Sequence, residues 1–374
     1  MRGSCSPENG NLLIGRKSML YASSTCGETR PERYCVLGAT QNASQCYVCD
    51  STQKNDASIF SHTISNIVST DPSKSKERWW QSENGVQDVY IQFDLEAEFL
   101  FTHMIMTFKT IRPAAMIIEK SSDFALTWKP IGYFAQSCGD SFPGIKTKQL
   151  NLGDVYCENK YSSETPTTNG QVIFRMLPPH LTTDKNPNSP EIQELLKITN
   201  LRFNFTRMHT FGDTLLDGRD DLKDKYYYAL YELVARGSCI CYGHSNKCIQ
   251  TPGIEYDDDA KGMIHGYCQC THNTAGTNCG KCMPLFNDRP WAPARLNETN
   301  ECKKCECNNH AEKCHFNETI FIESGRVSGG VCDFCQHNTE GRFCELCIDN
   351  HYRDPKRSID DIFTCRRNFS FLTV

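Results

Sequence analysis

The sequence lacks the features that would place it in a membrane or on a nucleic acid. No apolar run reaches the length of about 20 residues that a membrane-spanning helix needs. The formal net charge is −5, whereas a nucleic-acid-binding domain normally carries a basic patch or stripe. The first residues, MRGSCSPENG, contain no apolar signal segment, so we expect either that the signal peptide is missing from this chain or that export is not encoded here. We therefore predict no membrane span and no nucleic-acid partner.

Motifs of enzyme active sites are absent as well. There is no G-x-S-x-G nucleophile turn, no H-E-x-x-H zinc motif and no phosphate-binding loop. His103 and His209 are single histidines on strand-like segments, and alternation predicts an exposed or edge position for His103. We predict that the protein is not an enzyme, has no catalytic residue and needs no cofactor.

Cysteine, by contrast, is abundant, and its 23 residues divide the chain. Seven lie in residues 1–238, among aromatic and β-branched runs, and 16 lie in the polar, turn-rich residues 239–374. In the cytosol so many thiols would need metals or constant reduction, whereas in an oxidising compartment they form disulfides. Sequons for N-linked glycans favour the second interpretation. They lie at Asn42, Asn204, Asn297, Asn317 and Asn368.

Residues 79–108, WWQSENGVQDVYIQFDLEAEFLFTHMIMTF, predict a half-buried antiparallel sheet. After two tryptophans and an Asn-Gly turn candidate come two segments that alternate with period two. The core-facing residues are expected to be Val89, Ile91, Phe93 and Leu95 in the first strand, and Leu100, Met104, Met106 and Phe108 in the second. Further strands are expected within residues 11–24 and at residues 115–119, 131–135, 171–177, 198–206 and 226–235, with a loop at residues 177–190. The centre of the first part is therefore predicted to be a β-sandwich.

Three features of these strands have alternative interpretations. Residues 226–235, YYYALYELVA, also allow a short helix, but Tyr and Val favour a strand and no good N-cap precedes them. Trp79 and Trp80 suit a binding hot spot or a loop pinned onto the sheet, and we expect at least one to be buried. Asn204 lies between Phe203 and Phe205, so it faces solvent if the strand buries both rings.

Disulfides are expected within the first part. Cys46 and Cys49 are too close in sequence to close a loop easily, so nested pairs Cys26–Cys49 and Cys35–Cys46 are the more plausible geometry. Cys138 and Cys157 are then left to pair with each other. Cys5 is the odd residue, which predicts a partner upstream or a free thiol.

The second part is an internal repeat. HNTAGTNCGKC at residues 272–282 recurs as HNTEGRFCELC at residues 337–347, and each unit holds eight cysteines. Such units have too little apolar content for a core, and each short disulfide loop contributes about 2–4 kcal/mol. We expect a stiff rod of modules that contact only their neighbours. A zinc site is the alternative, with ligands from Cys268, Cys270, Cys279, Cys282, His265 and His272, but two complete octets with sequons favour disulfides.

Six motifs resemble a known family: SSTCG at residues 23–27, WWQSENG at 79–85, TFKTIRPAAM at 107–116, RMHTFGD at 207–213, YYYALYELVARGSC at 226–239, and the paired HNT-x-G signatures. The chain resembles the N-terminal region of laminin beta chains, and the match extends to Cys365. Netrins share the domain order, but they are expected to carry cysteines at the positions of Trp79 and Lys109. The absence of that pair favours laminin.

The resemblance implies a mainly β architecture, in which a jelly-roll, galactose-binding-like sandwich precedes a rod of disulfide-stapled EGF-like modules. The implied domains are a laminin N-terminal domain at residues 1–238, EGF-like repeats at 239–304 and 305–367, and a non-family tail at 368–374. It also implies the pairs Cys239–Cys248, Cys241–Cys268, Cys270–Cys279, Cys282–Cys302, Cys305–Cys314, Cys307–Cys332, Cys335–Cys344 and Cys347–Cys365.

The function that the resemblance implies is structural. Laminin N-terminal domains of alpha, beta and gamma chains meet and build the basement-membrane network, so the expected partners are the alpha and gamma domains, with cell-surface receptors as further candidates. The expected location is the extracellular matrix. The chain ends in RRNFSFLTV without coiled-coil heptads, and this predicts the alternative of a secreted competitor or a netrin-like ligand.

Candidate contact and calcium residues follow from the same resemblance. Pro166, Asn169 and Gly170 resemble an assembly motif of laminin N-terminal domains, although Asn-Gly is also a favoured hairpin turn. Asp71 lies where related domains hold a calcium ligand. Calcium takes about 6–8 oxygen ligands, however, and the neighbouring residues are poorly suited to supply them. Asp257, Asp258 and Asp259 are expected to form a solvated loop. We predict no resident metal, with calcium at the assembly node as the alternative.

Overall fold

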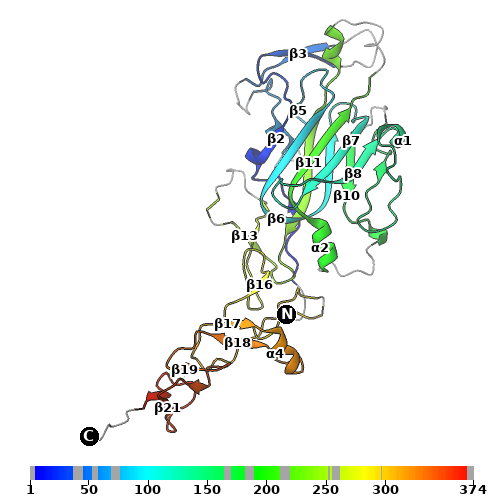
Figure 1. Cartoon of the computed structure of the whole chain (residues 1–374). Coiled ribbons are helices and arrows are strands. Elements are labelled where there is room, and N and C mark those ends of the chain that lie inside the picture. The colour runs from blue at the N-terminus through cyan, green and yellow to red at the C-terminus, as the bar shows by residue number, and fades with distance from the viewer. Residues whose placement is uncertain are drawn as a thin grey trace, which may run out of the picture. The chain divides into compact units, whose positions relative to one another are not determined.

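The computed structural model describes residues 5–36, 45–52, 58–68, 76–163, 170–181, 189–210, 220–251, 253–254, 262–295 and 297–368. Its contacts form two compact units, both drawn in Figure 1. The large unit comprises Glu8–Ile240 and Gln250–Gly266. The small unit comprises Cys241–Ile249 and Tyr267–Val374, together with Met1–Pro7.

A single long strand, β6 (Val89–Phe108), organises the large unit. The sequence predicted two strands here, which is wrong, because no turn residue interrupts the apolar alternation between Leu95 and Leu100. Buried side chains occupy the odd positions up to Phe101 and the even positions from Met104. The register shifts between Phe101 and His103, which identifies a bulge that exchanges the two faces. Leu100 was predicted to face the core with Met104. Because of this shift it is only half-buried, so that prediction is wrong for Leu100.

The bulge also separates two sets of hydrogen-bonding partners. The first half of β6 pairs with β2 (Leu20–Ala22) and β11 (Lys197–Arg207). The second half pairs with β10 (Gln171–Arg175) and β12 (Ala229–Cys239). A strand that changes partners at a bulge is the kind of corner that joins the two layers of a sandwich. Figure 1 shows β6, β11, β7 and β8 as neighbouring arrows.

The whole sheet has the order β1-β12-β6-β11-β7-β8-β9. Apart from the two that are one strand in β6, the expected strands of the large unit are confirmed, and residues 226–235 contain a strand and not a helix. The remaining strands are β1 (Gly10–Asn11), β5 (Trp80–Gln81), β7 (Ala115–Ser121), β8 (Lys129–Ala135) and β9 (Cys157–Glu158). A separate hairpin is formed by β3 (Glu32–Val36) and β4 (Gln45–Cys49).

Side chains from several strands meet in one core. The Phe205 ring of β11 lies 6.3 Å from Trp80, 5.6 Å from Phe108 and 5.0 Å from Tyr228, measured between ring centroids. Trp80 is 0% exposed, which agrees with the expectation that at least one of the two tryptophans is buried. Burial of such aromatic side chains is the main stabilisation of this sheet.

Short helices interrupt the predicted loops. The helix α2 (Pro190–Leu196) starts at the last residue of the expected loop, with Ser189 as N-cap and Pro190 at the first helical position. This Ser-Pro pair is a helix start signal that was not recognised in the sequence. The others are α1 (Cys138–Ser141), α4 (Glu318–Glu323) and the 3-10 helices η1 (Lys17–Met19), η2 (Ile64–Ile67), η3 (Pro179–Leu181) and η4 (Asp220–Lys225). No helix among the described residues is long and apolar enough to cross a membrane.

The small unit is built from short two-stranded sheets. They pair β13 (Cys248–Ile249) with β14 (Tyr267–Cys268), β15 (Thr274–Ala275) with β16 (Lys281–Cys282), β17 (Lys313–Phe316) with β18 (Gly330–Asp333), β19 (Thr339–Glu340) with β20 (Leu346–Cys347), and β21 (His351–Arg353) with β22 (Cys365–Arg367). Their buried residues are largely cysteines. The unit therefore depends on covalent links more than on an apolar core.

Disulfides join cysteines in both units. The large unit contains Cys26–Cys49, Cys35–Cys46 and Cys138–Cys157. The small unit contains Cys241–Cys268, Cys270–Cys279, Cys282–Cys302, Cys305–Cys314, Cys307–Cys332, Cys335–Cys344 and Cys347–Cys365. Cys239 and Cys248 are also disulfide-bonded, and Cys5 is a free thiol. The zinc alternative is wrong, because all four of its cysteines are in disulfides.

A buried ion pair attaches residues 262–266 to the large unit. Arg16 is 0% exposed, and its guanidinium donates two hydrogen bonds to the Glu96 carboxylate, at 2.7 and 2.5 Å. The same guanidinium donates to the carbonyls of Leu12 and Ile264, both at 2.8 Å. The Ile264 side chain is part of the core. A segment that the sequence assigns to the first repeat thus packs with the large unit.

Candidate functional site

The most distinctive surface of the large unit surrounds Trp79. Its indole is half-buried and stacks on the His62 ring at 4.2 Å. The Lys109 ammonium lies 3.8 Å from the centroid of the indole and 5.3 Å from that of Tyr231. The indole Nε1 donates to Gln81, and the Trp79 carbonyl accepts from Asn66. The first bond fixes the ring and the second fixes the backbone, so Trp79 is held in place and its two expected roles, anchor and contact residue, are compatible.

Burial controls the charges in this cluster. It lowers the pKa of His62 to about 4, and the nearby Lys109 cation acts in the same direction. His62 is therefore neutral at physiological pH, and its ring packs as an aromatic group. Burial also lowers the pKa of Lys109 and raises that of Tyr231. The indole face opposes the shift at Lys109, because a cation is attracted to an aromatic ring.

The contact between Trp79 and Lys109 was not predicted from the sequence, although a signal was available. These are the two positions at which netrins are expected to carry cysteines. If those cysteines form a disulfide, the two positions must be neighbours in the related fold. No sequence spacing predicts that His62 belongs to this cluster. His62 lies just before η2 and stacks on Trp79.

The neighbouring hairpin β3–β4 exposes apolar side chains. Tyr47 is 48% and Val48 49% exposed. Ile59 and Phe60 are also exposed, and the Phe60 carbonyl accepts a hydrogen bond from the Asp50 N–H at 2.9 Å. The hairpin is anchored by Cys26–Cys49 and by the Tyr34 ring, 5.6 Å from Tyr227. A rigid, solvent-exposed apolar surface is typical of a protein-binding site. We call Val36, Tyr47, Val48, Ile59 and Phe60 the hairpin surface. Val36 and Tyr47 lie on one face of the hairpin and Val48 lies on the other.

The predicted contact motif is only partly described. Pro166 and Asn169 lie outside the described residues. Gly170 is buried, has a φ of +52°, and would place a Cβ 2.5 Å from the carbonyl oxygen of Phe108. Its carbonyl accepts a hydrogen bond from Phe108 at 2.9 Å. Glycine is needed at this position for close packing on β6, which is a structural role.

The other predicted positions vary in exposure. Asn297 and Asn368 are exposed, Asn317 caps α4, and Asn204 is half-buried on β11. Asn42, Asp71, Asp257, Asp258 and Asp259 lie outside the described residues. His103 is half-buried between β10 and β12, so the predicted exposed or edge position is wrong. His103 lies next to the bulge of β6, which the period-two pattern does not indicate.

Each module of the small unit holds a histidine pair. The Nδ1 atoms of His244 and His272 lie 3.2 Å apart, and those of His310 and His337 lie 3.0 Å apart. The Nε2 atoms of His244 and His310 contact the carbonyls of Ala292 and Ile359. Because a carbonyl only accepts, each Nε2 donates, and the Nδ1 of the same ring accepts from its partner. The pairs are thus packing elements of the modules.

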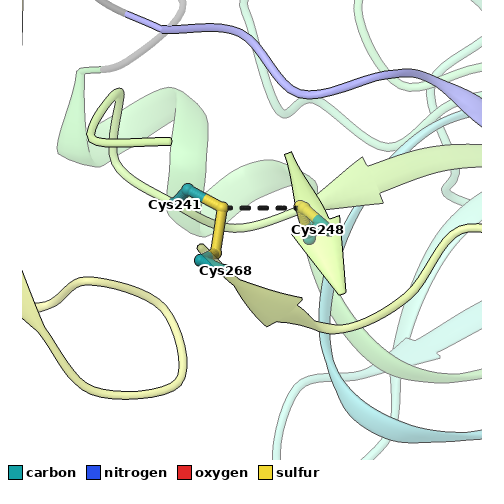
Figure 2. Close-up of side chains that lie close together, drawn as sticks. Cys241, Cys248 and Cys268 are labelled. Carbon is teal, nitrogen blue, oxygen red and sulfur yellow. Dashed lines mark hydrogen bonds between the residues drawn. A yellow bond between two sulfur atoms is a disulfide. The ribbon is translucent and has the colours of Figure 1, made fainter. Parts of the chain in front are cut away.

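The sulfurs at the start of the first module lie close together. Cys241 is bonded to Cys268, and the Sγ atoms of Cys241 and Cys248 are 3.8 Å apart, as Figure 2 shows. Paired β13 and β14 bring Cys248 opposite Cys268. Oxidised sulfurs are poor metal ligands, because the thiolate is the form that binds metal. This cluster is therefore structural.

Comparisons with known proteins match three consecutive segments of the chain. The laminin N-terminal domain (domain VI) profile matches residues 5–237, the laminin EGF domain profile residues 239–302, and the laminin/attractin EGF domain profile residues 305–360. Laminin subunit beta-2 of Rattus norvegicus is 52% identical over 368 residues, which are 98% of this chain and 20% of that protein. The chain thus spans about a fifth of the laminin beta subunits that it matches.

Two further similarities are more distant. Netrin-4 of Pongo abelii is 41% identical over 371 residues, which cover 97% of this chain and 57% of netrin-4. Among solved structures, a chitosan-binding module from Paenibacillus sp. IK-5 reaches a TM-score of 0.29 at 12% identity, covering 60% of this chain and 97% of the module. A similarity at that level carries no argument about sugar binding.

Proposed function

The chain belongs to the laminin family, as a laminin N-terminal domain followed by laminin EGF repeats, and we propose that it is a structural protein of the extracellular matrix. The observation that carries this proposal is the 52% identity to a laminin beta subunit over 98% of the chain. Disulfides in both units support it, because such bonds persist in oxidising compartments. Its proposed location is the basement membrane.

The finer proposal is that the large unit assembles with the N-terminal domains of laminin alpha and gamma chains. The hairpin surface supports this role, because it displays apolar side chains on an anchored scaffold. The Trp79 cluster stiffens the adjoining part of the sheet. Binding of this kind needs no catalytic step, so we expect no enzymatic activity.

Analytical ultracentrifugation tests the assembly role. The purified chain is mixed with alpha and gamma N-terminal fragments, with calcium and with a chelator. We expect a ternary complex, and its loss in chelator would assign calcium to the node. Separate species under both conditions would reject the assembly role.

A second candidate is a secreted competitor or netrin-like ligand that acts on a receptor or on existing laminin network. The 41% identity to netrin-4 supports it. Adding the chain to polymerising full-length laminin separates the two candidates. Incorporation with network growth supports assembly, whereas inhibition of polymerisation supports the competitor.

A further inference from the structure

The outer face of β11 carries a sequon among aromatic side chains. Phe203 and Phe205 are buried in the core, so Asn204 and Thr206, the first and third residues of the sequon, lie on the opposite face. Asn204 is directly opposite Tyr90 on β6 and Ile117 on β7. Side chains opposite each other on one face of a sheet lie about 5 Å apart at Cβ. Tyr90 is therefore the aromatic neighbour of Asn204.

The aromatic surface extends to both sides of Tyr90. The Tyr21 ring of β2 lies 5.7 Å from the Tyr90 ring and is 53% exposed. The Arg202 guanidinium lies 3.9 Å from the Trp128 ring and 5.2 Å from the Tyr90 ring. Arg202 also donates two hydrogen bonds to Gln92. These contacts fix the rings as a platform before any ligand arrives.

The Asn204 amide is already oriented in a way that a glycan preserves. Its Nδ2 donates to a carboxylate oxygen of Glu119 at 2.7 Å. A primary amide has two N–H bonds, and N-glycosylation replaces one of them. When the sugar replaces the N–H that does not point at Glu119, the remaining N–H still donates to Glu119. The hydrogen bond would then hold the glycosidic amide in a single orientation over the sheet.

We propose that an N-linked glycan on Asn204 covers this face, with its first N-acetylglucosamine packed on Tyr90 and Tyr21. The polarised C–H groups of a sugar ring match the negative face of an aromatic ring. A glycan at this position excludes proteins from the outer face of β6, β11 and β7. Assembly contacts then use other surfaces of the large unit, such as the hairpin surface.

The attachment is a group transfer from a lipid-linked oligosaccharide pyrophosphate in the secretory pathway, so the inference rests on the proposed secretion. The Nδ2–C1 bond forms and the bond between C1 and the pyrophosphate oxygen breaks. The lipid pyrophosphate leaves, and the amide nitrogen loses one proton to a base of the transferase. No redox partner is needed.

The test uses the full chain secreted from mammalian cells. Glycopeptide mass spectrometry should find Asn204 occupied. Native digestion with an amidase that removes N-glycans should release the Asn204 glycan roughly five-fold more slowly than the glycan at exposed Asn297, because packing on the rings protects it. An unoccupied Asn204, or equal release from both sites, would overturn the proposal.

Two tyrosine variants make the test specific. Tyr21→Ala should raise the release rate at Asn204 toward that at Asn297. Tyr47→Ala removes a similarly exposed tyrosine from the hairpin surface and should leave the rate unchanged. Equal effects of the two variants on the release rate at Asn204 would contradict the proposed packing of the glycan on Tyr21. Ultracentrifugation with alpha and gamma fragments is an independent readout, so failure of the glycan proposal is distinguishable from failure of the assembly role.

Discussion

At the scale of the residue, the ion pair between Arg16 and Glu96 is the most sensitive position. Both side chains are almost fully buried, and the Arg16 donors are satisfied by one carboxylate and two carbonyls. Removing one partner leaves the other charge uncompensated in a medium of low dielectric constant. The ion pair therefore holds the Ile264 segment on the sheet. The free-energy cost of removing the two charges from water is offset only while both partners are present.

We predict that Arg16→Met lowers the free energy of unfolding by about 3–5 kcal/mol. Urea denaturation followed by fluorescence measures the change. The control is Arg33→Met, whose partner Asp224 lies 3.9 Å away at the surface, and it should cost less than about 1 kcal/mol. Equal small losses in both variants would contradict the buried bridge.

His62 makes stability depend on pH. Its pKa is about 4 in the folded chain against 6.5 for an ordinary histidine. Between these values the unfolded chain binds a proton that the folded chain does not, so the free energy of unfolding falls as the pH is lowered through this window. The full loss is about 3–4 kcal/mol.

His62→Phe should remove this component, because phenylalanine stacks on Trp79 without titrating. Urea denaturation of parent and variant at about pH 7 and about pH 4.5 gives the difference in slope. His315→Phe, at an exposed histidine of the small unit, should keep the parent slope in the large unit. If parent and His62→Phe lose the same stability, His62 is not a buried neutral ring.

At the scale of the element, each module depends on its histidine pair. His310 is fully buried, and its ring contacts both Ile359 and His337. We predict that His310→Phe lowers the stability of the second module by about 1–3 kcal/mol, because a buried carbonyl and a ring nitrogen lose their partners. Hydrogen exchange over residues 305–365 measures this loss. His315→Phe in the same module should have little effect, and an equal effect would contradict the account.

Elements with a strong local pattern could be predicted from the sequence. The strands of the large unit alternate with period two, and the strand at residues 226–235 followed from Tyr and Val propensity. The change of the core-facing residues from odd to even positions was visible in the sequence, but it was interpreted as a break between two strands. That this change is a bulge within a single strand β6 depends on pairing with β12. Helix α2 could have been found from Ser189 and Pro190, a start signal within a proline-rich loop.

The site was less predictable than the strands. Trp79 was identified in the sequence because it is a tryptophan, a residue type common in binding hot spots. His62 and Tyr231, however, contact it only through tertiary packing. The burial of Gly170 against β6 likewise depends on a neighbouring strand. The Ile264 segment packs on the large unit through the hydrogen bond that Arg16 donates to the Ile264 carbonyl. These two residues lie far apart in the sequence, so no local pattern predicts this contact. Long-range contacts of this kind are absent from local patterns.

At the scale of the whole molecule, covalent links replace an apolar core in the small unit. We predict that a thiol reductant unfolds the modules and that a metal chelator leaves them folded, because the cysteines are in disulfides and not on zinc. Circular dichroism and hydrogen exchange of the treated chain measure this. Unfolding by the chelator under oxidising conditions would contradict the disulfide account.

The assembly claim is tested most directly by ultracentrifugation of the chain with alpha and gamma laminin N-terminal fragments. We predict a ternary complex that the double substitution Tyr47→Asp, Val48→Asp weakens at least about ten-fold, because charges in an apolar contact must be desolvated. Leu126→Asp, at an exposed position away from the hairpin surface, is the control and should leave the complex intact. Separate sedimentation of all three parent proteins, with and without calcium, would contradict the account.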